Sequence, residues 1–134
     1  PFWKADFVSR FDGEGAPWQK AVAVVESMAF LLQANIDHMA AYVPAARRIR
    51  VSGGVSRLDG LCRRLASVSG LPVHRREDPE ASARGIAYLA AGRPVLWNTA
   101  AHEEVFAPQP DAALRARYLR WQDLMQEATG VRYL

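Results

Sequence analysis

The sequence predicts a single α/β domain in which a short sheet is flanked by helices. Short β-type runs alternate with amphipathic helical segments, and glycine or proline residues separate them. The chain has 134 residues, of which 50% are hydrophobic, and this is enough for one hydrophobic core. The expected order is helix, strand, helix, strand, helix, helix.

The first helix is predicted to begin at Pro17 and to end before Pro44. Proline suits a first helical turn because it lacks an N–H that this turn leaves unused. Residues 1–15 have no helical period and are expected to form an irregular lead-in. The apolar stripe of the helix recurs at steps of four and three, and comprises Trp18, Val22, Val25, Ala29, Leu32, Ile36, Met39 and Val43.

A strand, a glycine turn and a second helix are expected next. Residues 48–52 are predicted to form the strand, which is followed at once by Gly53 and Gly54. The helix is predicted over residues 57–69, and Gly70 is a typical residue at which a helix stops.

The rest of the chain predicts one more strand and two more helices. Residues 71–74 fit a strand, residues 79–92 a helix, residues 95–110 a loop, and residues 114–129 a final helix. Glycine inside a helix costs roughly 1 kcal/mol, so Gly85 in the third helix predicts close packing at that position.

Charge and cysteine content narrow the class of protein. The net charge is +3, and paired arginines raise the question of a polyanion partner. These pairs lie within amphipathic patterns, so a solvated face is expected and no nucleic-acid partner. Cys62 is the only cysteine and is expected to be buried. No internal disulfide can form, so a reducing, cytoplasmic compartment is the simpler interpretation. No apolar run approaches the roughly 20 residues of a membrane span, and no metal site is predicted.

The strand, turn and helix of residues 49–66 carry the candidate chemistry. Glycines allow a backbone to approach an anion closely, and the positive end of a following helix favours negative charge. Ser56 is expected to cap that helix, with Asp59 reaching back. A glycine turn on its own is also consistent with a purely geometric role.

Other segments of the sequence bear on how this turn is interpreted. VSGGVS at 51–56, LASVSGLPV at 65–73 and EASARGIAYLAA at 80–91 follow the helical segment AVAVVESMAFLLQANID at 21–37. In this order they resemble the C-terminal domain of the FGGY family of carbohydrate kinases. The resemblance extends over most of the chain from Pro17. It implies that residues 1–134 are one such domain, the C-terminal lobe of a ribonuclease H-like (actin-like ATPase) fold.

The resemblance implies a function as well as a fold. In that family two lobes enclose a cleft, with ATP mainly against the C-terminal lobe and the sugar or polyol mainly against the N-terminal lobe. The chain would then be the ATP-binding lobe of a kinase that phosphorylates a carbohydrate hydroxyl, with Mg²⁺ held mainly through the other lobe. The catalytic base belongs to that other lobe, so no catalytic residue is expected here and the chain alone should be inactive.

Five nucleotide-binding residues are implied by the same resemblance. Gly53 and Gly54 match glycines whose backbone faces the phosphates, and Val55 and Ser56 match the rest of the turn. Leu58 matches a position that often presents a small or amide side chain to adenine. Two residues depart from the family pattern: Val55 stands where many relatives have a third glycine, and Leu58 offers apolar contact without a hydrogen bond.

Two alternative functions stay open at this stage. The chain would also fit a non-catalytic regulatory or interaction module derived from a kinase lobe, or a lobe of another actin-like ATPase. A homodimer is open as well, because a lobe separated from its partner exposes apolar surface.

Overall fold

Three short strands form one sheet in the computed structural model of the protein, which describes residues 7–77, 80–95 and 102–130. The strands are β1 (Ile49–Val51), β2 (Val73–Arg76) and β3 (Glu103–Phe106), and β2 lies in the middle. β1 is parallel to β2, whereas β3 is antiparallel to it. This arrangement, with helices packed on it, confirms the predicted α/β class.

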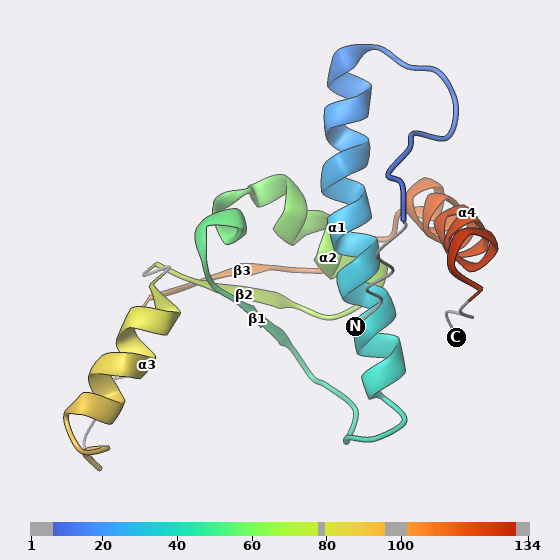
Figure 1. Ribbon diagram of the computed structural model, residues 1–134. Helices are drawn as coiled ribbons and strands as arrows, with labels where there is room; N and C mark the ends of the chain where they lie inside the picture. The colour runs from blue at the N-terminus through green and yellow to red at the C-terminus, as the bar shows by residue number, and fades with distance from the viewer. Residues whose placement is uncertain (1–6, 78–79, 96–101, 131–134) are drawn as a thin grey trace.

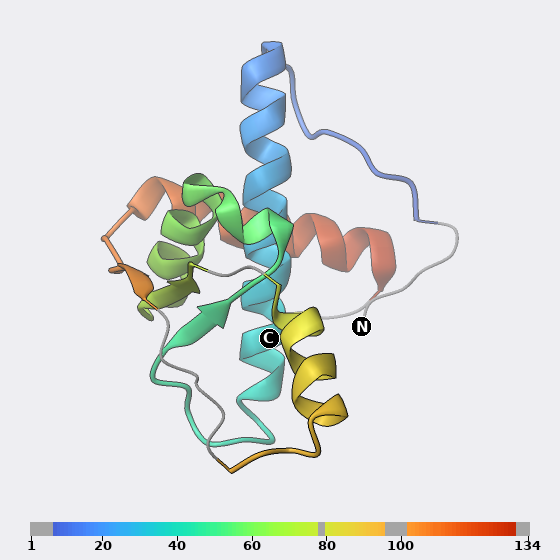
Figure 2. The same cartoon turned by 90° about the vertical axis from the view of Figure 1, so that its left-hand side faces the viewer.

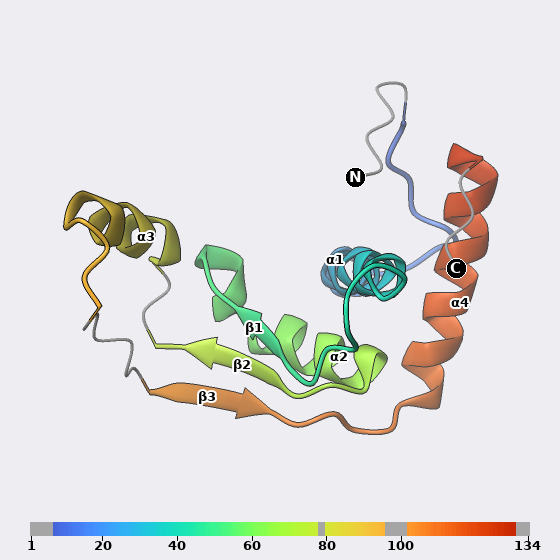
Figure 3. The ribbon, with the colours of Figure 1, turned by 90° about the horizontal axis from the view of Figure 1, so that it is seen from below.

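Four helices accompany the sheet. They are α1 (Pro17–Met39), α2 (Asp59–Ser69), α3 (Ala81–Ala90) and α4 (Ala112–Thr129). Figures 1 and 3 show α1, α2 and α4 gathered together, with α2 lying along the sheet, while α3 stands near the opposite end of the strands. None of the described helices is long and apolar enough to cross a membrane.

The hydrophobic core is built around α2. One cluster joins α2 to α1 and the sheet, and consists of Ala29, Leu61, Cys62, Leu65, Ala66, Val73 and Phe106. A second cluster joins α2 to α1 and α4, and consists of Phe30, Val68, Leu114 and Tyr118. Helix α2 is therefore held on three sides, and the turn that precedes it is anchored to the most buried part of the molecule.

The predicted stripe of α1 is confirmed in part. Ala29 is fully buried, and Val25 and Ile36 pack against the same cluster. Four other members of the stripe are exposed, namely Trp18, Leu32, Met39 and Val43. Residues 7–16 have no helix or strand and arch beside α1, as predicted for this part of the lead-in (Figure 2).

The structure corrects the predicted loop at residues 95–110. Residues 103–106 form β3, and residues 96–101 lie outside the described residues. A search for hydrophobic patterns misses this strand because it begins with two acidic residues. Glu103 and Glu104 lie opposite Arg76 and Arg75 of β2. Opposite charges across a strand pair stabilise the sheet in place of apolar contacts.

Two helical predictions are also corrected. The helical stripe was predicted to continue to Val43, whereas α1 ends at Met39, and residues 40–43 form turns whose N–H groups return to the carbonyls of residues 36, 37 and 39. Close packing at Gly85 is wrong for the described chain, because a Cβ placed there would meet no atom within 4 Å and α3 has no buried residue. The apolar period of α3 indicates which face of the helix is apolar, but it does not show that another element packs against that face.

Candidate functional site

The Gly53-Gly54 turn adopts a backbone that requires glycine at its first position. Gly53 has φ 94° and ψ 170°, a region in which other residues are strained. A Cβ on either Gly53 or Gly54 would meet no atom within 4 Å. The backbone is therefore open to a ligand on the side where a side chain would otherwise stand.

The turn closes on itself through Ser56. Its N–H donates to the Gly53 carbonyl at 3.1 Å, and its Oγ donates to the same oxygen at 2.6 Å. The Leu58 N–H donates to the Val55 carbonyl at 3.1 Å. Within the described chain, the Gly54 and Val55 N–H groups make no hydrogen bond. These two donors are the ones that the turn offers to an anion.

The expected cap at Ser56 is wrong. A 3₁₀ turn over Gly54–Arg57 separates the glycines from α2, whose N-cap residue is Leu58 and has no side-chain capping bond. Ser56 is buried, and its hydroxyl is used within the turn. The carboxylate of Asp59 stands in the first turn of α2, where it opposes an added negative charge. The candidate anion contacts are therefore in the turn itself.

A groove of about 390 Å³ adjoins the turn between α1 and α2. Its wall on the α1 side is apolar, and Leu58 and Leu61 contribute apolar surface from the other side. Leu58 and Val55 are both exposed, so their side chains can meet a ligand. The complete lining is Ala21, Val22, Val25, Arg57, Leu58, Asp59, Gly60, Leu61 and Arg64.

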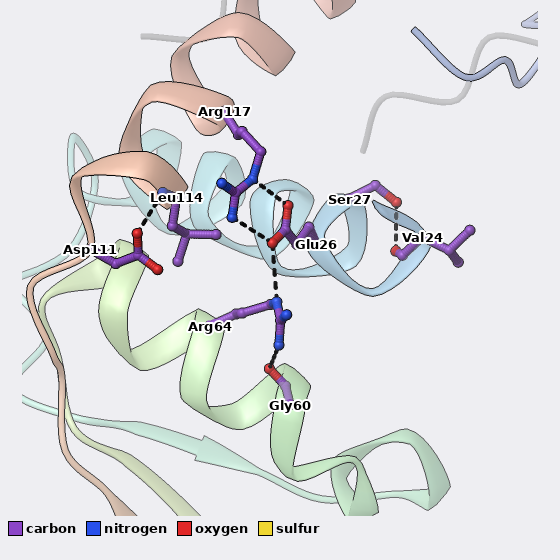
Figure 4. Close-up of polar contacts among 8 residues, drawn as sticks. All are labelled: Val24, Glu26, Ser27, Gly60, Arg64, Asp111, Leu114 and Arg117. Atoms are coloured by element: carbon purple, nitrogen blue, oxygen red, sulfur yellow. Dashed lines mark hydrogen bonds and ion pairs between the residues drawn. The ribbon is translucent and has the colours of Figure 1, made fainter. Parts of the chain in front are cut away.

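A buried carboxylate fixes one side of this groove. Glu26 of α1 is 5% exposed and accepts hydrogen bonds from Arg117 of α4 at 2.7 and 2.8 Å. It also accepts one from Arg64 Nε at 3.2 Å, and Arg64 Nη1 donates to the Gly60 carbonyl at 3.2 Å (Figure 4). Arg64 is thereby held along the groove by two partners.

The charge state of Glu26 follows from these contacts. Burial by itself raises the pKa of the carboxyl, but the hydrogen bonds and charges of Arg117 and Arg64 outweigh burial and hold the pKa below its usual value. Glu26 is therefore ionised near neutral pH, and it joins α1, α2 and α4.

A second ionic cluster lies beneath the turn, on the sheet side of α2. Arg75 of β2 donates to the Ser56 carbonyl at 2.9 Å and pairs with the Asp59 carboxylate at 2.8 Å. It also pairs with Glu104 of β3, and its guanidinium lies 5.0 Å from the centre of the Phe106 ring. The hydrogen bond that Arg75 donates to Glu104 is the largest factor that raises the pKa of Arg75.

Cys62 is buried, as predicted from its place in the helical pattern. Its Sγ donates to the Ser56 carbonyl at 3.3 Å, and burial raises the pKa of the thiol. A raised thiol pKa lowers the thiolate fraction at neutral pH, which disfavours a nucleophilic role. The side chain instead helps to hold the carbonyl that Arg75 also contacts.

The sequence places the glycine turn correctly beside the start of α2 but does not identify its supports. Glu26 lies among apolar residues of α1, and its two arginine partners are distant in the sequence. A single charged residue on the buried face of an amphipathic helix was the available signal for Glu26. In the described ranges, no group of three or more His, Cys, Asp or Glu side chains is placed to hold a metal ion.

Comparison with known proteins decides the family. The model of the FGGY family of carbohydrate kinases, C-terminal domain, matches residues 1–92. The chain belongs to this family. Its resemblance to FGGY kinases, first inferred from the strings around the glycine turn, is thereby confirmed.

Relatives of this FGGY domain include glycerol kinases. The chain is 32% identical to the glycerol kinase of Roseobacter denitrificans over 136 aligned residues, which covers 91% of this chain and 28% of that protein. It is 36% identical to the glycerol kinase of Allorhizobium ampelinum over 86 aligned residues, which covers 58% of this chain and 17% of that protein. The chain thus spans less than a third of the length of these relatives.

Solved structures support the fold. The xylulose kinase of Lactobacillus acidophilus superposes with a TM-score of 0.71 at 20% identity, covering 99% of this chain and 29% of that chain. The xylulose kinase of Rhodospirillum rubrum gives a TM-score of 0.61 at 23% identity, over 78% of this chain and 23% of that chain. At such identities the likeness concerns the fold alone, and it confirms the predicted ribonuclease H-like fold of the lobe.

Proposed function

We propose that this FGGY domain is the ATP-binding lobe of a kinase that transfers the γ-phosphoryl group of ATP to a hydroxyl of a sugar or polyol. The observation that carries the proposal is the open glycine turn beside an apolar groove. Such a turn allows phosphate oxygens to approach backbone N–H groups, and an apolar groove suits the face of a purine base. We include all of residues 1–134 in this lobe and expect a cytoplasmic protein.

Each residue of the predicted site has a distinct role in this proposal. The backbone of Gly53, Gly54 and Val55 faces the phosphates, with the N–H groups of Gly54 and Val55 as donors. Ser56 closes the turn and keeps those donors in place. Leu58 contacts the base by apolar packing, so recognition of the adenine edge would depend on other groups.

Mg²⁺ is part of the proposed reaction, since it neutralises charge on the transferring phosphate when bound. The described residues of this lobe supply no cluster of carboxylates for it. We therefore assign the ion to the phosphates and to the remainder of the kinase. The catalytic base is assigned there too, and the 134-residue chain alone should show no ATP-dependent phosphorylation of glycerol, the first acceptor to assay.

Calorimetric titration of the natural full-length protein with ATP and Mg²⁺ tests the nucleotide site. Gly54→Ala adds a methyl group where no protein atom lies within 4 Å, so the fold should be retained. If the phosphates occupy that space, the Kd for ATP should rise roughly tenfold, as expected when a tightly packed contact is overfilled. Gly85→Ala is the matched control, because it adds the same methyl group at another open glycine, on α3.

The alternative is a regulatory or interaction module that has lost nucleotide use. Val55 and Leu58 favour it, because both are exposed apolar side chains at positions where the family resemblance implies smaller or polar ones. No heat of binding at millimolar ATP in the full-length protein would support this alternative and reject the kinase proposal. An equal Kd in wild type and Gly54→Ala would instead place the nucleotide elsewhere.

A further inference from the structure

We propose that Arg75 is a positioning residue that holds the Gly53–Ser56 turn in the conformation that receives nucleotide. The inference rests on the proposed function, because it concerns the same turn. Arg75 lies on β2, the strand next to the one that leads into the turn, and its contact with the turn is the hydrogen bond to the Ser56 carbonyl. Its effect on nucleotide would therefore be exerted through the backbone of Ser56.

The guanidinium joins three structural elements at one point. Nη1 donates to the Ser56 carbonyl at the end of the turn, and Nη2 pairs with Asp59 at the first residue of α2. Nη2 also pairs with Glu104, which lies directly opposite Arg75 on β3. The Phe106 ring lies against the guanidinium plane from the same strand. The sheet thus fixes the guanidinium, and the guanidinium fixes the turn.

The turn is constrained at both of its ends. At its start, Gly53 has a backbone conformation that other residues rarely adopt, and its carbonyl accepts both the N–H and the Oγ of Ser56. At its end, the Ser56 carbonyl accepts from Arg75 and from Cys62 Sγ. The two free N–H donors lie between these fixed points. A change at the Ser56 carbonyl would tilt them, because adjacent peptide planes share one Cα atom.

The ion pairs of Arg75 favour a positioning role over direct attraction of phosphate. Arg75 is paired with two carboxylates, so its charge is already compensated within the cluster. Both of its terminal nitrogens are occupied by acceptors of this chain, which leaves the guanidinium committed to the protein. Lysine cannot replace it, because a single ammonium lacks the planar fork that reaches a carbonyl and two carboxylates at once.

Arg75→Lys in the natural full-length protein is the principal test, with Arg50→Gln as the matched control. Arg50 is an exposed arginine on the adjacent strand that pairs with Glu103 at 3.3 Å, and the register places it on the other face of the sheet. Glu104→Gln is the second variant, since it weakens the hold on Arg75 without removing the guanidinium. Three quantities are compared: the Kd for ATP, the KM for the acceptor, and amide hydrogen exchange at Ser56 and Leu58 without nucleotide.

We expect Arg75→Lys to raise the Kd for ATP roughly tenfold, as misplaced binding groups do, while the acceptor KM stays within about twofold. Exchange at the Ser56 and Leu58 amides should accelerate, with a smaller effect of the same kind in Glu104→Gln and none in Arg50→Gln. An unchanged Kd and unchanged exchange in folded Arg75→Lys or Glu104→Gln would overturn the inference. A parallel rise in acceptor KM would also overturn it, since that points to general loss of structure.

The two proposals fail in different ways. A wild-type protein that does not bind ATP would overturn the kinase proposal, and the role of Arg75 in nucleotide binding with it. A wild-type protein that binds ATP with an affinity insensitive to Arg75→Lys, but sensitive to Gly54→Ala, would overturn only the role of Arg75.

Discussion

Helices α2 and α3 have similar lengths and both follow a strand of the sheet, yet only α2 is buried. Helix α2 contributes Leu61, Cys62, Leu65, Ala66 and Val68 to the core, and these residues contact α1, α4 and the sheet. Helix α3 has no buried residue, and its Ile86 and Leu89 side chains are 69% and 57% exposed. An amphipathic period therefore identifies an apolar face, whereas burial depends on what the rest of the fold brings to that face.

The strongest test of this contrast is to shorten one leucine on each helix of the 134-residue chain. Leu65→Ala should lower the free energy of unfolding by about 3 kcal/mol, because Leu65 is 1% exposed and its loss leaves a cavity. Leu89→Ala should change it by less than about 0.5 kcal/mol, as is usual at an exposed position. Urea unfolding followed by circular dichroism measures both. Equal losses in the two variants would contradict the contrast.

The ionic support of α2 gives the next largest expected effect. Glu26→Gln removes the negative charge that pairs with both Arg64 and Arg117, and should lower the free energy of unfolding by about 2 kcal/mol at pH 7. This loss is smaller than for a fully buried ion pair, because both arginines are partly exposed.

The pH dependence of this loss has a definite sign. The pKa of Glu26 is lower in the folded than in the unfolded chain, so its contribution is present above the unfolded value of about 4.3 and is lost as pH falls through the folded value. The stability difference between wild type and Glu26→Gln should therefore shrink on acidification below about pH 4. A difference that grows on acidification would show that Glu26 is not stabilised by its arginines.

Apart from the comparison variant Leu89→Ala, the smallest expected effect is a local one on α3. Gly85→Ala should increase the local stability of this helix by about 0.5–1 kcal/mol, because alanine is a better helix former and the added methyl group meets no atom within 4 Å. Amide hydrogen exchange across residues 81–90 measures the gain. Destabilisation instead would revive the original prediction that this glycine allows close packing.

The sequence was sufficient to predict those elements that depend on residues close together in the chain. The period of α1, the strand before Gly53 and the stop at Gly70, which has φ 70°, follow from patterns within a few residues. The glycine turn was also found locally, and the surrounding strings indicated the family.

Features that depend on distant residues could not be predicted in the same way. Strand β3 is stabilised by charges on β2, and the cap expected at Ser56 was replaced by a bond within the turn. The contacts of Arg75 involve the turn before α2, strand β3 and the first residue of α2. Such contacts depend on the completed topology, because each residue alone looks like an ordinary solvated charge.

The bond between Glu26 and Arg117 also bears on the order of folding during synthesis. These two residues are separated by 91 positions, and Leu114 and Tyr118 enter the second core cluster from the same helix. While the ribosome is still adding α4, the Glu26 carboxylate has only Arg64 as an available arginine partner among those it contacts in the finished structure. The first core cluster needs no residue of α4, whereas the second cluster and the full pairing of Glu26 wait until residues 112–129 have emerged.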